Sequence, residues 1–182
     1  MNVFEATRDA GVPTFVFASS AQVYRINDPV RVDELPIPES SHLPLPAEGQ
    51  TTYGFLKAAF ERYLAGRCTS GSTQALALRL EYPGFRSRQP ANLYVSTSVD
   101  NTVAGFACAL RAPELGFDVF NIADREVDPG VVDIQAYVRS RWPFAVNRTV
   151  GNECLMSTEK ARRLLGYGPV PDGRYMAESL VW

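Results

Sequence analysis

A tyrosine and a lysine spaced one helical turn apart could form an acid–base pair. Tyr53 and Lys57 lie in the segment TTYGFLKAAFERYL (51–64), and Lys57 is one of only two lysines in the chain. On a helix, residues i and i+4 share a face. An ammonium group at that distance favours the phenolate form of a tyrosine, which could then exchange protons near neutral pH. The pattern is short, so two surface side chains that share a helix face are the alternative.

A pair of serines follows an apolar segment upstream of this helix. The segment TFVFASS (14–20) is rich in β-forming residues and predicts a strand buried on both faces, as in a parallel sheet. Open α/β sheets bind ligands at the carboxyl ends of their strands. The hydroxyl of Ser20 could therefore orient a substrate oxygen beside Tyr53, whereas a Ser-Ser turn is the alternative.

The elements that must position these residues are predicted from hydrophobic periodicity and from breakers. Further buried strands are expected at 74–80 and 117–123, and helices at 2–10, 52–65, 99–111, 131–140 and from Ser157 to 165. Strands that alternate with helices predict an α/β protein with a largely parallel sheet.

Three local features refine this prediction. Residues 25–50 contain five prolines and predict a long loop, and Gly66 is expected to end the helix that carries Tyr53. The helix at 99–111 is expected to present one apolar face, made of Val99, Val103, Phe106, Ala107 and Leu110.

Composition and charge exclude several classes of protein. The 182 residues are 46% hydrophobic with a net charge of −2, so neither a nucleic acid nor an anionic membrane is expected as a partner. Three cysteines and one histidine show no metal-ligand spacing, so no metal site is expected. No apolar run is long enough to cross a membrane, and the N-terminus does not read as a signal peptide. A cytoplasmic location is expected, and 16 arginines against two lysines hint at a bacterial source.

Several segments together resemble the extended short-chain dehydrogenase/reductase family, the NAD-dependent epimerase/dehydratase group. The resemblance implies an α/β fold: a partial Rossmann-type parallel sheet with flanking helices and a small C-terminal substrate-side region. It implies one domain over 1–182, with 1–80 as the catalytic half and 81–182 mainly on the substrate side with interleaved Rossmann elements. The matching segments, in the family's order, are NVFEATRDAGVPTFVFASSAQVY, TTYGFLKAAFERYL, ALALRLEYPGF, YVSTSVDNTVAGFACAL, DVFNIADRE and STEKARRLLGY.

The resemblance also implies roles for individual residues. Tyr53 would be the catalytic acid/base, Lys57 its partner and a ligand of the nicotinamide ribose, and Ser20 the catalytic hydroxyl. The implied reaction transfers a hydride from a sugar or nucleotide-sugar carbon to NAD or NADP. Tyr82 and Pro83 would lie beside the cofactor.

Four further residues are expected on the substrate side. The resemblance places Ala21 and Gln22 beside the substrate with Ser20. Arg86 and Arg88 could clamp a phosphate or carboxylate, although arginines in such a loop can also be solvated.

Two departures from the family narrow the reaction. Relatives that act as 4,6-dehydratases carry an Asp-Glu pair where this chain has Ala21 and Gln22, which cannot exchange protons in the same way. A dehydratase is therefore disfavoured, and an epimerase, reductase or dehydrogenase remains. Tyr82 stands where epimerases carry an asparagine that contacts the nucleotide-sugar phosphate, which weakens a nucleotide-sugar substrate. A Tyr-Pro-Gly turn is the alternative at that position.

The glycine-rich turn that holds the cofactor pyrophosphate in this family is not found. None of the 13 glycines lies three residues from another, as a G-x-x-G-x-x-G turn requires. We therefore expect an N-terminally truncated family member that exposes the edge of the strand at 14–20 and binds NAD(P) weakly or not at all alone. A separate cofactor-binding chain or a homodimer through the Tyr53 helix is possible, and a non-enzymatic remnant or interaction module is the alternative.

Overall fold

A parallel three-stranded sheet forms the centre of the computed structural model, which describes residues 2–24, 32–41, 52–68, 73–87, 94–128 and 133–176. Its strands are β1 (Thr14–Ser20), β3 (Gln74–Leu80) and β4 (Phe117–Asn121), in the order β1-β3-β4. Both neighbouring pairs are parallel. The expected α/β class with a parallel sheet is confirmed.

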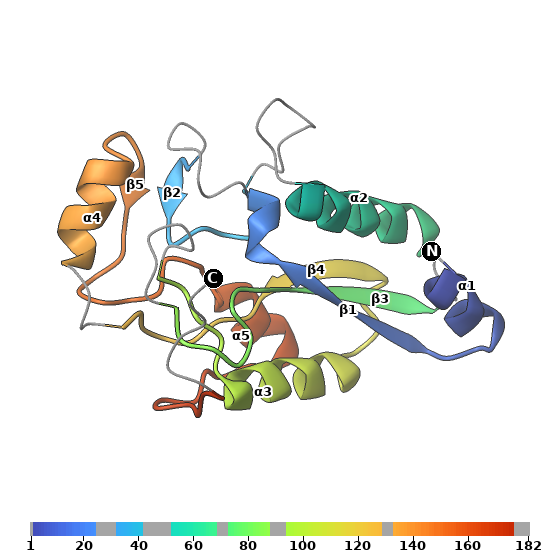
Figure 1. Ribbon diagram of the computed structural model, residues 1–182. Helices are drawn as coiled ribbons and strands as arrows, with labels where there is room; N and C mark the ends of the chain where they lie inside the picture. Colours follow the sequence, from blue (N-terminus) through green and yellow to red (C-terminus); the bar gives the residue numbers. More distant parts are fainter. Residues whose placement is uncertain are drawn as a thin grey trace.

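Helices cover both faces of this sheet (Figure 1). Helix α2 (Thr52–Arg67) lies over one face, with α1 (Asn2–Asp9) at the end of the sheet where β1 begins. Helices α3 (Val99–Leu110) and α5 (Glu159–Leu165) lie on the opposite face. Side chains alternate along β3 because successive residues of a strand point to opposite faces. Ala75 packs with Leu64 of α2, whereas Leu76 and Leu78 pack with Ala109 of α3.

A second group of elements lies beyond the carboxyl ends of the strands. It contains the 3-10 helix η1 (Ala21–Tyr24), the short parallel strands β2 (Glu34–Leu35) and β5 (Val146–Asn147), and α4 (Ile134–Arg141). These elements share a hydrophobic core that includes Trp142 and Leu155. The prediction of an uninterrupted loop over 25–50 is therefore wrong at β2, although much of that segment lies outside the described residues.

Strand β1 is an edge strand of the sheet as far as the structure describes it. Its first four residues are half-buried, Ala18 is exposed, and only Ser19 and Ser20 are buried. The prediction of a strand buried on both faces is wrong for most of its length, because β3 pairs with it on one side only. The open edge agrees with the expectation from sequence.

Helix α2 does not end at Gly66. It continues to Arg67, whose guanidinium pairs with Glu5 of α1 at 2.9 and 3.0 Å. The next residue still donates a helical hydrogen bond from its N–H to the carbonyl of Leu64. Contact with α1 thus extends the helix past a residue that often ends one. The last helix also begins later than predicted, with Thr158 and not Ser157 at the N-cap position.

Helix α3 buries a different face from the predicted one. Its buried residues are Asn101, Gly105 and Ala109, whereas Val103 and Leu110 are 62% and 61% exposed. Small residues let the helix approach the sheet closely. A Cβ atom on Gly105 would lie only 2.7 Å from the side chain of Ile122. Close backbone packing therefore decided the buried face, and side-chain hydrophobicity did not.

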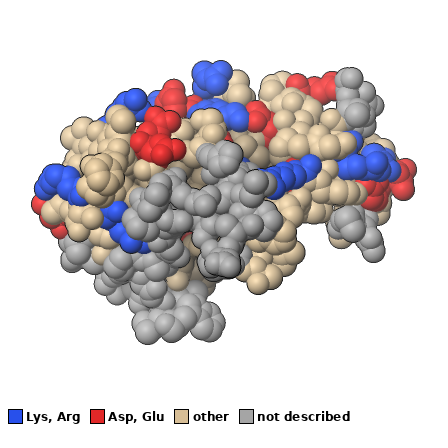
Figure 2. Space-filling view, turned by 90° about the horizontal axis from the view of Figure 1, so that it is seen from above, with Lys and Arg blue, Asp and Glu red and all other residues tan. Residues whose placement is uncertain are grey.

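Acidic and basic side chains are interspersed over the coloured residues of the face shown in Figure 2, in keeping with the net charge of −2. None of the described helices combines the length and the apolar character needed to cross a membrane.

Candidate active site

A cavity of about 450 Å³ opens where β1 and β3 end and α2 begins. This is the end of a parallel sheet at which α/β proteins bind ligands. The structure brings most of the residues selected from the sequence to this one cavity. Its lining is Ala18, Ser19, Ser20, Gln22, Tyr53, Lys57, Leu80, Glu81, Tyr82, Pro83 and Phe85.

Lys57 is held at the cavity by the edge of the sheet. Its Nζ donates to the carbonyl oxygen of Ala18 at 2.7 Å and lies 4.9 Å from the centroid of the Phe17 ring. The same Nζ lies 5.3 Å from the centroid of the Tyr53 ring. Burial lowers the pKa of Lys57, since desolvation disfavours the ammonium. The two side chains therefore face the same space, with the ammonium near the aromatic ring.

The two serines at the end of β1 have different environments. Ser19 is buried and donates to the carboxylate of Glu61 at 2.5 Å. Ser20 Oγ accepts a hydrogen bond from the backbone N–H of Gln22 at 3.2 Å, so the serine turn considered from the sequence is present. Accepting that bond leaves the hydroxyl hydrogen of Ser20 able to be donated to a ligand. The turn and a ligand-orienting role are thus compatible.

A buried polar network beneath the cavity fixes β1, α2 and β3 relative to one another. Arg79 of β3 donates from Nε and Nη2 to the two carboxylate oxygens of Glu61 on α2, at 3.0 and 2.7 Å. Its Nη1 donates to the Tyr24 hydroxyl at 2.7 Å. Arg79 and Glu61 are each 2% exposed. Since Ser19 joins the same carboxylate, this ion pair positions the strand end that carries Ser20.

Glu81 is the ionisable residue of this lining that the sequence analysis did not select. It follows the last residue of β3, is 4% exposed, and accepts a hydrogen bond from the side-chain amide of Gln22 at 3.1 Å. Burial raises its pKa to about 7, and the Gln22 hydrogen bond opposes that shift in part. The available signal was an acidic residue directly after a buried strand, at the ligand-binding end of the sheet.

The next residues form a tight turn that shapes one wall of the cavity. The N–H of Phe85 donates to the carbonyl of Tyr82 at 3.0 Å, with Pro83 and Gly84 at the central positions. Gly84 has φ +83°, which glycine adopts readily and which a type II turn requires. Tyr82 itself has φ +46°, a left-handed conformation that costs a non-glycine residue about 1–2 kcal/mol.

The remaining predicted site residues lie elsewhere. Ala21 is fully buried in the core of the second group of elements and does not line the cavity. Arg86 lines a separate cavity of about 460 Å³, where its guanidinium lies 3.7 Å from Asp128 and 4.7 Å from the centroid of the Tyr175 ring. Arg88 lies outside the described residues.

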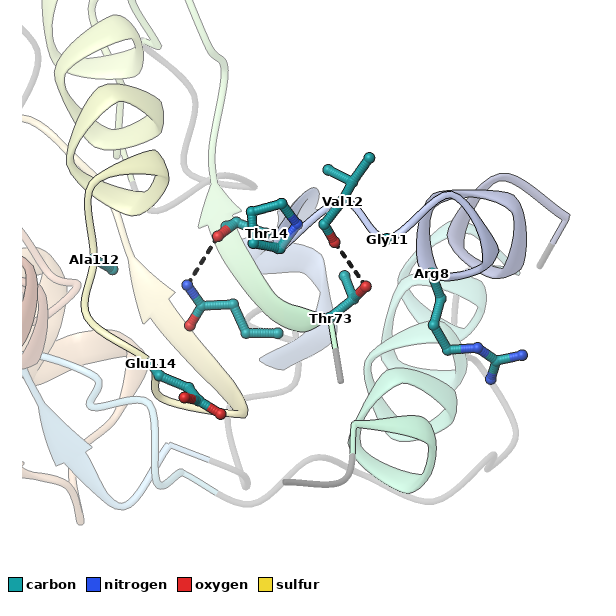
Figure 3. A pocket seen from close by; sticks show the side chains of 9 residues that line it. Arg8, Gly11, Val12, Thr14, Thr73, Ala112 and Glu114 are labelled. Atoms are coloured by element: carbon teal, nitrogen blue, oxygen red, sulfur yellow. Dashed lines mark hydrogen bonds between the residues drawn. The ribbon is translucent and has the colours of Figure 1, made fainter. Parts of the chain in front are cut away.

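A larger hollow of about 700 Å³ lies at the opposite, amino-terminal end of β1 and β3 (Figure 3). Its polar groups are mostly paired with one another. Thr73 donates to the carbonyl of Val12 at 2.7 Å, and the Gln74 amide donates to the Thr14 hydroxyl at 2.9 Å. The side chain of Arg8 points away from the hollow in Figure 3 and pairs with Glu5. The charged side chains of its lining are Arg8, which is paired, and the exposed Glu114, so this hollow offers a single carboxylate with no second acid–base group beside it.

Within the described part of the chain, no group of three or more His, Cys, Asp or Glu side chains could hold a metal ion.

Comparison with known proteins identifies a family match over the segment that forms this cavity. Residues 1–83 match the model of the NAD dependent epimerase/dehydratase family. The resemblance inferred from the sequence is therefore confirmed for this part of the chain. No curated protein sequence gives a match.

Several solved structures share the fold of this chain. A short-chain dehydrogenase/reductase superfamily protein from Agrobacterium tumefaciens with bound NAD is 20% identical, with a TM-score of 0.65 over 93% of this chain and 66% of its own. A UDP-galactose 4-epimerase is 23% identical, with a TM-score of 0.60 over 93% and 62%. A UDP-glucose 4-epimerase with UDP-glucose from Thermotoga maritima is 18% identical, with a TM-score of 0.61 over 92% and 62%.

These identities establish the fold alone. The chain spans between 62% and 66% of the length of these three solved structures.

Proposed function

We propose that this chain, whose residues 1–83 match the NAD dependent epimerase/dehydratase family, forms the catalytic and substrate-side part of an NAD(P)-dependent oxidoreductase. Its substrate would be a sugar or nucleotide sugar, oxidised at a hydroxyl-bearing carbon. The observation that carries the proposal is that Ser20, Tyr53 and Lys57, which come from two distant segments, line one cavity at the carboxyl end of the sheet.

Each of the three side chains has a chemical task in this proposal. Tyr53 takes the proton of the substrate hydroxyl as the carbon is oxidised, and returns it in the reverse direction. Lys57 stabilises the phenolate through its positive charge, from a position fixed by the Ala18 carbonyl. Ser20 donates a hydrogen bond to the substrate oxygen and holds it beside Tyr53. A nicotinamide cofactor supplies the hydride acceptor when it is bound.

The residues at the cavity fit one end of such a cofactor and not the other. The Tyr53 hydroxyl and the Lys57 ammonium can hydrogen-bond a ribose, and Tyr82 and Pro83 add an apolar wall. A pyrophosphate needs a row of backbone N–H groups at a glycine-rich turn, and the 13 glycines provide no such spacing. We therefore propose that this chain alone binds NAD(P) weakly, and that further residues or a second polypeptide supply the pyrophosphate site.

Turnover by a tyrosine variant tests the proposed function. The full chain, together with any protein that co-purifies with it, is incubated with NAD⁺ and a panel of neutral sugars, uronates and UDP-sugars, and absorbance at 340 nm is followed. Tyr53→Phe should lower kcat by about 10²–10⁴-fold, because it removes the acid/base hydroxyl. Tyr63→Phe is the matched control, since Tyr63 lies on the same helix but contacts Glu5 of α1. Equal turnover by wild type and Tyr53→Phe would overturn the role of Tyr53.

A non-enzymatic role is the second candidate, and the missing glycine spacing favours it. A chain that neither quenches NADH fluorescence at millimolar cofactor nor turns over any sugar in the panel would support this alternative.

A further inference from the structure

The backbone of Glu81 is held in place by hydrogen bonds, and this fixes where its side chain begins at the cavity. Glu81 N–H donates to Thr97 Oγ1 at 3.4 Å, and the same hydroxyl lies 3.0 Å from the carbonyl oxygen of Glu81. Thr97 is itself fully buried. Ser20 and Leu80 are paired residues in neighbouring strands, so Gln22 and Glu81 follow the ends of adjacent strands. The topology thus places an amide and a carboxyl group side by side at the strand ends.

Glu81 is one of three described acidic residues that are buried without an ion pair, together with Glu39 and Asp124, and it is the one that lines this cavity. Glu61 is also buried, but it is neutralised by the guanidinium of Arg79 at 2.7 Å. Glu81 is 4% exposed and is bonded to an uncharged amide. Burying a carboxyl group without a counter-ion is costly, and the hydrogen bond from Gln22 offsets that cost only in part. A ligand that bonds the carboxyl group from the cavity side would offset more of it.

The rest of the cavity indicates the chemical class of that ligand. Among the described lining residues, the ionisable side chains besides Glu81 are Lys57, Tyr53 and Tyr82. Lys57 is the only cation of this lining, and it is bonded to the Ala18 carbonyl at the edge of the sheet. Neither the Gln22 amide nor the Glu81 carboxyl can neutralise an anion. Both can accept hydrogen bonds from hydroxyl groups, and the amide and the protonated carboxyl can also donate them.

We propose that Gln22 and Glu81 form a hydroxyl-binding pair that selects a neutral, polyhydroxylated part of the substrate and disfavours a carboxylate or phosphate at that end of the cavity. This inference deepens the proposed function, because it assumes that the same cavity binds the sugar. It assigns Glu81 a role in specificity, since a carboxylate repels an anionic substituent while it accepts hydroxyl donors.

Two ligands that differ only at C6 test the inference. UDP-glucose and UDP-glucuronate are titrated into the full chain by calorimetry at pH 8, where Glu81 is ionised. Wild type should bind UDP-glucose at least about tenfold more tightly than UDP-glucuronate. Glu81→Gln has the same shape without the charge, and should reduce this preference to about threefold or less. Glu126→Gln removes an exposed carboxylate that lines the separate Arg86 cavity, and should leave the preference unchanged.

A second variant addresses the hydrogen-bonding half of the pair. Gln22→Met keeps the length of the side chain and removes its amide, and should weaken UDP-glucose binding by about three- to tenfold. An unchanged preference in Glu81→Gln, equal binding of the two ligands by wild type, or no binding of either ligand would each overturn the inference.

The proposed function has a separate readout in these proteins. Tyr53→Phe should retain the preference for UDP-glucose while it loses hydride transfer. If the preference behaves as expected but Tyr53→Phe turns over normally, the proposed function fails and the specificity role of Glu81 stands.

Discussion

Replacing Glu61 with glutamine should destabilise the protein strongly and so test the buried ion pair beside the candidate active site. The substitution removes the negative charge that faces Arg79, while both residues remain 2% exposed. The guanidinium would then be buried against neutral partners, the Tyr24 hydroxyl and the Glu39 carbonyl. Breaking a buried pair in this way costs about 3–5 kcal/mol. That is a large part of the roughly 5–15 kcal/mol by which folded domains are stable.

Urea unfolding followed by circular dichroism measures this effect. With a slope of about 2 kcal/mol per molar urea, the midpoint should fall by about 2 M. Arg148→Ala is the control, because Arg148 pairs with Glu34 at a similar distance of 2.6 Å but with 65% and 39% exposed side chains. That surface pair should contribute about 0–1 kcal/mol. The argument that burial makes the pair essential would be refuted if the Glu61→Gln midpoint lay within about 0.5 M urea of the Arg148→Ala midpoint.

Two further predictions concern the wall of the cavity. Burial raises the pKa of Glu81 to about 7, above its ordinary value of 4.5, so the native state binds more protons than the unfolded state between these values and stability falls as pH rises. The unfolding free energy of wild type relative to Glu81→Gln should therefore drop by up to about 3 kcal/mol from pH 4.5 to 7.5, measured by urea titration at each pH. The titration of Glu39 contributes equally to both proteins, so it cancels in this comparison. A difference in unfolding free energy that stays constant with pH would contradict the prediction. Tyr82 and Tyr94 both have positive φ, but Tyr82 is half-buried and Tyr94 is 2% exposed. Tyr82→Gly should change the unfolding free energy by less than about 1 kcal/mol, because the relief of backbone strain offsets the lost contacts. Tyr94→Gly should lower the unfolding free energy by about 3–5 kcal/mol. Equal losses of stability in the two variants, measured by thermal or urea unfolding, would show that backbone strain at Tyr82 is unimportant.

Local sequence pattern was sufficient for the elements of the central sheet. The strands predicted at 14–20 and 74–80 have the observed bounds, and each of the five predicted helices overlaps an observed one. Each of these segments carries enough apolar residues to specify its own type. Strands β2 and β5 could not be predicted, since each has two residues and forms only because distant segments meet. The buried face of α3 was mispredicted because Gly105 and Ala109 pack closely on the sheet and because Asn101 is buried through its hydrogen bond to Asp124, at 2.7 Å.

The candidate site divides in the same way. Ser20, Tyr53 and Lys57 were selected from spacing and from family resemblance, and the structure brings them to one cavity. Glu61 and Glu81 were not selected, because a glutamate on a helix or after a strand has no distinctive local pattern. Their importance depends on partners 18 and 59 residues away, Arg79 and Gln22. Arg79, the one charged residue of β3, was the local signal of a buried counter-ion.

The bond from Lys57 to the Ala18 carbonyl links two properties that are usually studied apart. A backbone acceptor on the outer strand of a sheet can pair with another molecule's strand, and a lysine placed over it discourages such pairing. Substituting Lys57 would therefore remove a group to which we assign a catalytic role and would also expose a site for self-association. A loss of turnover in a Lys57 variant should be accompanied by a light-scattering measurement, because aggregation of the protein and loss of its chemistry would lower the measured rate in the same way.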